Sequence, residues 1–143
     1  MTARGVADRL GGTKVLKREV RSDLDLADAI RVGLPTRVVQ EVLRSGLFEP
    51  GELYEIVVAR RTLAHRREKR QPLSPEQSDR LARMVRVAER AEEALGNREK
   101  ASRWLRKPNR ALQGKRPIDL LESDIGARMI ERTLGRIEHG VFS

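Results

Sequence analysis

The chain of 143 residues contains no cysteine, which excludes disulfide bonds and thiol chemistry. It also contains no apolar run close to the roughly 20 residues that a membrane-spanning helix needs. Residues 1–22 carry scattered charges and no apolar block, so we expect no signal peptide. Together these absences predict a cytoplasmic protein without a membrane partner.

Aromatic residues are scarce, at 3% of the chain, whereas charged residues make up 36%. Strands draw on aromatic and β-branched residues, while amphipathic helices need only an apolar stripe. The 38% of apolar residues is enough for a modest core. We therefore expect an all-α protein.

Groups for catalysis or metal binding are also few. The chain has two histidines, His65 and His139, and neither lies in a metal-type spacing such as His-Glu-x-x-His. A glycine-rich phosphate loop is missing as well. Because a catalyst needs several convergent ionisable groups, we expect neither an enzyme nor a cofactor or metal site.

The positive charge that is present is concentrated in two segments. The chain has a net charge of +9, and residues 60–70 hold six basic residues against Glu68. Residues 98–116 hold eight basic residues against Glu99. Such blocks either meet anionic surfaces or form solvated faces.

Four helical segments are expected before residue 71, each separated from the next by glycine, proline or another break. In the first, Leu24, Ala27 and Ile30 share one stripe, and Gly33 follows as a stop signal. The fourth is short and strongly basic, with Leu63 as its only large apolar residue. The segments span residues 24–33, 35–46, 49–58 and 60–70.

A boundary is expected at residues 71–75, where a new helix begins. Ser74 suits an N-cap, Pro75 suits the first helical position, and Gln77 completes a capping box. Residues 109–116 are expected to form a loop. The expected elements after the boundary are helices over 74–96, 97–107 and 123–140, and a short turn that Pro117 opens.

The order of short helices before the basic segment matches a helix-turn-helix motif, whose second helix enters the major groove of DNA. Residues 52–57 would form the supporting helix, and Leu63 would anchor the recognition helix to the core. A solvated surface helix is the alternative. Arginine can bridge guanine, and threonine or histidine can reach bases or phosphates. The candidate DNA-binding residues are Arg60, Arg61, Thr62, His65, Arg66 and Lys69.

Several spaced motifs resemble the Xre antitoxins of Xre/RES toxin-antitoxin modules, also called the MbcA/ParS family. The resemblance covers residues 24–143 and combines separated short motifs. They are Arg61-Thr62-Leu63, Leu73 to Leu81, Glu92 to Gly96, Lys100-Ala101, Trp104-Leu105, Pro108-Asn109, Ala111-Leu112, Gly114, Pro117, Leu120-Leu121 and Leu134 to Phe142.

The resemblance implies a Cro-like helix-turn-helix bundle followed by a small helical toxin-binding domain. It gives an N-terminal extension over 1–23, the DNA-binding domain over 24–72 and the toxin-binding domain over 73–143. The implied partners are operator DNA and a RES-domain toxin that consumes NAD, with the antitoxin as a homodimer that represses its own operon. The antitoxin itself would bind no NAD.

Two residues depart from the family pattern in the DNA-binding turn. Many relatives have a glycine and then a serine where this chain has Val57 and Ala59. Valine is poorly suited to a left-handed turn, and alanine cannot cap the helix that follows. These departures leave the strength of DNA binding open and do not bear on the toxin-binding domain.

The end of the chain is the expected toxin-blocking region. The family mechanism implies that the tail enters the toxin's active site, with Phe142 in apolar contact and the terminal carboxylate at cationic groups. Alternatively, Phe142 folds back onto the last helix. The candidate toxin-binding residues are Arg136, Glu138, His139, Val141, Phe142 and Ser143.

Other interpretations stay open. The basic segment 98–116 could line the toxin interface or be a solvated face, and Trp104 is expected in the core rather than at an interface. For the whole chain, the alternative is a stand-alone transcriptional regulator whose C-terminal helices dimerise it.

Overall fold

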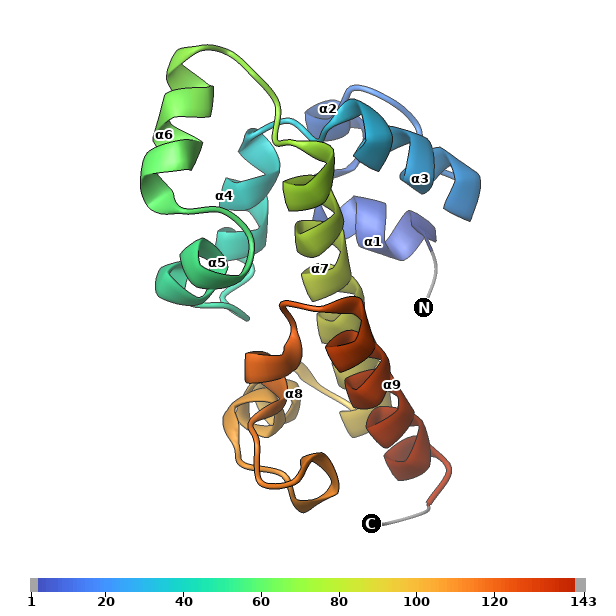
Figure 1. Ribbon diagram of the computed structural model, residues 1–143. Helices are drawn as coiled ribbons and strands as arrows, with labels where there is room; N and C mark the ends of the chain where they lie inside the picture. Colours follow the sequence, from blue (N-terminus) through green and yellow to red (C-terminus); the bar gives the residue numbers. More distant parts are fainter. Residues whose placement is uncertain (1–2, 141–143) are drawn as a thin grey trace. The chain divides into compact units, whose positions relative to one another are not determined.

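A computed structural model describes residues 3–140, and every regular element among them is a helix (Figure 1). The all-α class that the composition predicts is confirmed. The chain divides into two compact units, which we call unit 1 (residues 1–85) and unit 2 (residues 86–143). None of the helices in the described range is both long and apolar enough to cross a bilayer.

Unit 1 begins with two short helices, α1 (Ala3–Arg9) and α2 (Gly12–Leu16). The sequence indicated only an extension over residues 1–23. In the structure α1 contacts both α2 and α3, and α2 contacts α4. Apolar side chains of this segment, among them Val6, Leu10 and Val15, are buried. The segment therefore contributes to the core of unit 1.

Helix α3 (Asp23–Val32) begins where Ser22 accepts a hydrogen bond from the backbone N–H of Asp25. The apolar stripe seen in the sequence is not buried as a whole, because Leu24 is 71% exposed and Ala27 is also exposed. The buried residue of α3 is Ala29. Apolar residues occur on several sides of this helix, and packing against α1 selects the side that carries Ala29.

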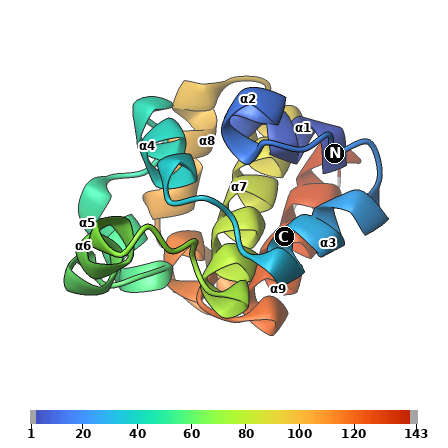
Figure 2. The same ribbon diagram turned by 90° about the horizontal axis from the view of Figure 1, so that it is seen from above.

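Three helices follow, α4 (Arg37–Arg44), α5 (Pro50–Ile56) and α6 (Arg60–Glu68). They gather in one part of unit 1 in both views (Figures 1 and 2). Helices α4 and α5 bury apolar residues at helical spacing, as the sequence predicts, and α6 buries Leu63. The buried residues are Val38, Val39, Val42, Leu53, Ile56 and Leu63.

Helix α7 (Pro75–Leu95) starts at the predicted capping box, which the structure confirms. The Ser74 N–H donates to Gln77 Oε1 at 2.9 Å, and the Gln77 N–H donates to Ser74 Oγ at 3.1 Å. The division between the units falls within α7, after Val85. It therefore lies later than the boundary at residues 72–73 that the sequence indicated.

Unit 2 contains the rest of α7, α8 (Arg98–Arg106), the 3-10 helices η1 (Arg110–Leu112) and η2 (Pro117–Leu120), and α9 (Asp124–Glu138). The expected loop over 109–116 thus holds a helical turn. Asn109 starts that turn, since its side chain accepts from the Ala111 N–H at 2.9 Å. The core residues are Val87, Ala88, Ala91, Ala101, Leu105, Leu112, Ile118, Leu121, Ala127, Ile130 and Leu134.

A close backbone approach joins η2 to the first turn of α9. Ser123 caps α9 by accepting from the Gly126 N–H at 3.0 Å. A side chain at Gly126 would overlap the carbonyl oxygen of Leu120. Glycine at this position therefore allows α9 to lie against η2.

Candidate functional site

Helix α6 presents the basic surface of unit 1. Its anchor, Leu63, is buried, as expected. Because a helix turns by about 100° per residue, Arg61 and His65 lie roughly opposite Leu63. The exposed candidate DNA-binding residues are Arg60, Arg61, Thr62, His65 and Lys69.

The sixth candidate, Arg66, has a different environment. Its Nη1 donates to the carbonyl oxygen of Pro72 at 2.8 Å, and the side chain is only partly exposed. The Gln71 N–H also donates to the Arg66 carbonyl at 2.8 Å. Arg66 therefore fastens the end of α6 to the segment that leads into α7.

The turn between α5 and α6 does not require glycine. Val57 lies at φ −102° and ψ −61°, which is the right-handed helical region, and its side chain is buried. The expected strain of valine in a left-handed turn is therefore absent. Ala59 precedes α6 without a side-chain cap, as its chemistry predicts.

A side chain from α7 supports this turn. Arg80 donates from Nε and Nη2 to the carbonyl oxygen of Val57, at 3.2 and 3.0 Å. Carbonyl groups at a helix C-terminus lack partners within their helix. Arg80 supplies a hydrogen-bond donor for such a carbonyl at the end of α5. It thereby fixes the backbone just before α6.

In unit 2, two arginines of α7 hold α9 by ion pairs. Arg86 donates from Nε and Nη2 to Glu131 Oε1, at 3.1 and 2.8 Å. Arg90 contacts both carboxylate oxygens of Glu138, at 2.6 and 3.1 Å. The hydrogen bond from Arg90 lowers the pKa of Glu138 below its ordinary value, and the same bond raises the pKa of Arg90.

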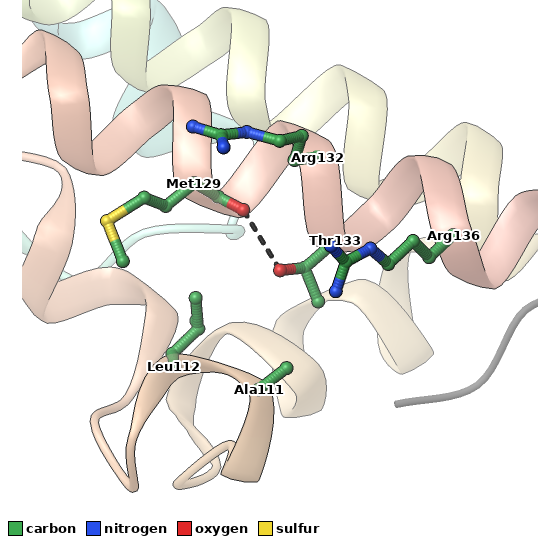
Figure 3. Close-up of a pocket in the computed structure, with 6 residues that line it drawn as sticks. All are labelled: Ala111, Leu112, Met129, Arg132, Thr133 and Arg136. Atoms are coloured by element: carbon green, nitrogen blue, oxygen red, sulfur yellow. Dashed lines mark hydrogen bonds between the residues drawn. The ribbon is translucent and has the colours of Figure 1, made fainter.

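The surface between η1 and α9 is hollowed into a pocket of about 120 Å³ (Figure 3). Leu112 and Met129 face each other across it, and the Thr133 hydroxyl donates to the Met129 carbonyl at 2.9 Å. Two arginines belong to its lining. The lining residues are Ala111, Leu112, Met129, Arg132, Thr133 and Arg136.

The candidate toxin-binding residues have different surroundings. Arg136 lines the pocket, Glu138 pairs with Arg90, and His139 is exposed at the C-cap of α9. Three of them, Val141, Phe142 and Ser143, lie outside the described residues.

The second basic segment is mostly exposed, and Trp104 on α8 is half-buried. Sequence reasoning gave no role in either site to Arg80, Met129, Arg132 or Thr133. Arg132 does have a signal, since it lies four residues before Arg136 and therefore on the same face of the helix. Arg80 has none, because its acceptor lies 23 residues away.

Two family models match the chain. The Antitoxin Xre-like helix-turn-helix domain matches residues 25–86. The Antitoxin Xre/MbcA/ParS C-terminal toxin-binding domain matches residues 90–140. The chain belongs to the Xre antitoxin family. The family resemblance that the sequence motifs indicated is confirmed.

Curated Xre antitoxins are similar over most of their length. "Antitoxin Xre" of Yersinia enterocolitica serotype O:8 / biotype 1B is 33% identical over 120 residues, which is 82% of this chain and 81% of that protein. "Antitoxin Xre" of Pseudomonas putida is 33% identical over 122 residues, 85% of this chain and 76% of that protein.

A third relative shares a shorter segment. The "Prs ADP-ribosylating antitoxin" of Sphingobium sp. is 40% identical over 82 residues, or 51% of this chain and 52% of that protein. The family domains imply that this Xre antitoxin has a toxin and DNA as its partners.

Proposed function

We propose that this chain neutralises a RES-domain toxin that consumes NAD, by covering the toxin's active site with the C-terminal region. The observation that carries the proposal is the match of the toxin-binding domain to residues 90–140. This range contains α9, which carries the candidate toxin-binding residues Arg136 and Glu138.

The name of one relative supports the proposal that the toxin consumes NAD. One relative is named for an antitoxin linked to ADP-ribosylation. ADP-ribosylation transfers a group from NAD, so that name is compatible with a partner that consumes NAD. We further propose a toxin-binding domain over residues 73–143 and a DNA-binding domain over residues 24–72, preceded by an extension.

The DNA-binding role is proposed for the exposed face of α6. Lysine and arginine contacts to phosphates would supply much of the affinity, and Arg61, Thr62 and His65 would face base edges. Helix-turn-helix proteins commonly bind two half-sites as dimers, so we propose a homodimer that represses its own operon. Arg66 is a positioning residue in this proposal, because it holds the Pro72 carbonyl.

Co-expression with the toxin encoded by the neighbouring gene tests the main claim. The parent chain should restore growth, and a chain that ends at Gly140 should not. This truncation removes Val141, Phe142 and Ser143 but keeps the ion pair between Arg90 and Glu138. A second truncation at Ile137 should also fail.

The matched control is Arg90→Gln in the full chain, which removes the ion pair with Glu138 but keeps the tail. It should still restore growth. If the chain that ends at Gly140 protects cells fully, the tail does not block the toxin. If the parent chain binds its own promoter DNA but fails to protect, the alternative of a stand-alone regulator is favoured.

A further inference from the structure

The pocket of unit 2 is too small for a cofactor. Sites for small molecules usually measure about 300–1,000 Å³. At about 120 Å³, this pocket has room for part of one side chain. It lies within the residues matched by the toxin-binding domain.

The charges at the pocket indicate what it accepts. Arg132 and Arg136 are exposed, and neither forms an ion pair within residues 3–140. Two arginines of α7, by contrast, pair with carboxylates of α9: Arg86 with Glu131 and Arg90 with Glu138. Among the described residues, Arg132 and Arg136 therefore present two guanidinium groups without a carboxylate partner on neighbouring turns of α9.

The remaining lining is largely apolar. Leu112 is buried, Met129 is partly exposed, and Ala111 adds a small side chain at the edge (Figure 3). Methionine is flexible and polarisable, so it adapts to an inserted apolar group. The Thr133 hydroxyl already donates to the Met129 carbonyl. An apolar floor beside two cations is complementary to an apolar side chain next to a carboxylate.

We infer that this pocket binds an acidic segment of the toxin, with one apolar side chain inserted and a neighbouring aspartate or glutamate paired with Arg132 and Arg136. The inference rests on the proposed function, because it needs a toxin partner. It adds a second contact, on the side of α9, to the contact proposed for the tail. Arginine can bind a carboxylate through two parallel hydrogen bonds, which fixes the orientation of the segment.

Charge reversal tests the electrostatic part. Arg132→Glu and Arg136→Glu should each weaken binding of the purified neighbouring toxin by about 10- to 100-fold, since each leaves a carboxylate of the partner facing a like charge. The matched control is Arg37→Glu, an exposed residue at the start of α4 in unit 1. It makes the same change in net charge where a helix N-terminus favours a carboxylate.

Cross-linking tests the occupant directly. The chain lacks cysteine, so Met129→Cys creates a single thiol in the pocket. A thiol-specific photo-cross-linker there should capture a toxin peptide that holds an acidic residue beside an apolar one. Ile125→Cys is the control, because Ile125 lies on the same helix, is 71% exposed and is outside the pocket.

The outcomes separate the two proposals. If the parent chain does not bind the toxin, the proposed function fails. If the parent binds and both arginine variants bind equally well, the pocket inference alone is overturned. It is also overturned if Met129→Cys captures no toxin peptide or only a basic one. Circular dichroism of each variant shows whether a loss of binding arises from unfolding.

Discussion

Arg80 supports the turn of the helix-turn-helix motif from a different helix. Its two N–H groups bind the Val57 carbonyl, which otherwise would have no helical partner. Because Val57 stays in the right-handed region, the turn tolerates a β-branched residue. The geometry before α6 therefore depends on a guanidinium group rather than on a glycine.

Replacement of Arg80 should affect both stability and DNA binding. Arg80→Met keeps much of the length and removes every donor, so we expect a loss of about 1–3 kcal/mol in the free energy of unfolding. Urea denaturation measures this loss, and fluorescence anisotropy with promoter DNA measures affinity. Arg80→Lys keeps the charge without the forked donor. Its free energy of unfolding and its DNA affinity should therefore lie between those of the parent and Arg80→Met. An Arg80→Met variant as stable as the parent would show that Arg80 does not support the turn before α6.

The Glu138 carboxylate makes the end of α9 sensitive to acid. Its pKa is lowered by the hydrogen bond from Arg90, from an ordinary value of 4.5. A group with a depressed pKa contributes stability above its unfolded pKa and loses that contribution as the pH falls through the folded pKa. The last turn of α9 should therefore loosen in acid, below about pH 4.5.

An NMR titration of the Glu138 side-chain carbon tests this statement. In the parent chain its midpoint should lie below 4.5. In Arg90→Gln the guanidinium is missing, so the midpoint should rise toward the ordinary value. The same midpoint in both proteins would show that Arg90 does not cause the shift.

Short-range contacts are the ones that the sequence predicts best. The capping pairs at Ser74 and Ser123 join residues three apart, so their types and spacing define the interaction. The hydrogen bonds from Arg80 and Arg66 join residues that no local pattern links. Such contacts become visible only when the tertiary fold brings the segments together.

Among the helices, α1 and α2 bury apolar residues although their sequence shows no clear apolar stripe. Residues 3–16 include several charged residues between their apolar ones, so no clear stripe is evident. In α3 the reverse occurs, because an apparent stripe is exposed. Propensity and periodicity predict that a helix exists, but the neighbouring helices decide which side is buried.

Two leucines test this assignment with the same substitution. Leu10 follows α1 and is 0% exposed, whereas Leu24 in α3 is 71% exposed. Leu10→Ala should lower the free energy of unfolding by about 2–5 kcal/mol, because it leaves a cavity. Leu24→Ala should change it by no more than about 0.5 kcal/mol. Chemical denaturation measures both, and equal effects would contradict the packing of the N-terminal segment.

At the scale of the molecule, the two proposed binding sites lie in different compact units. Helix α6 belongs to unit 1, and the pocket and the end of α9 belong to unit 2. The start signal at Ser74 to Gln77 marks the beginning of α7, yet the units divide inside that helix. A capping box predicts a helix start and carries no information about where a compact unit ends.

Separate units predict that the two functions can be lost separately. Arg61→Ala should weaken binding to promoter DNA and leave toxin neutralisation intact, since Arg61 lies on the outer face of α6. If Arg61 contacts a phosphate, the slope of log affinity against log salt should also fall by about 0.9. Arg44→Ala, on α4, removes the same charge and serves as the control. Equal losses in the two variants would indicate an effect of net charge alone.

The division after Val85 also sets an order of events during synthesis. All of unit 1, including α1 and α2, has been made while residues 86–143 are still to be added. Domains generally fold as units, and the N-terminal one folds first on the ribosome. A nascent antitoxin would thus carry a folded DNA-binding unit before its toxin-binding unit exists. The order of the two units along the chain is therefore also the order in which they fold.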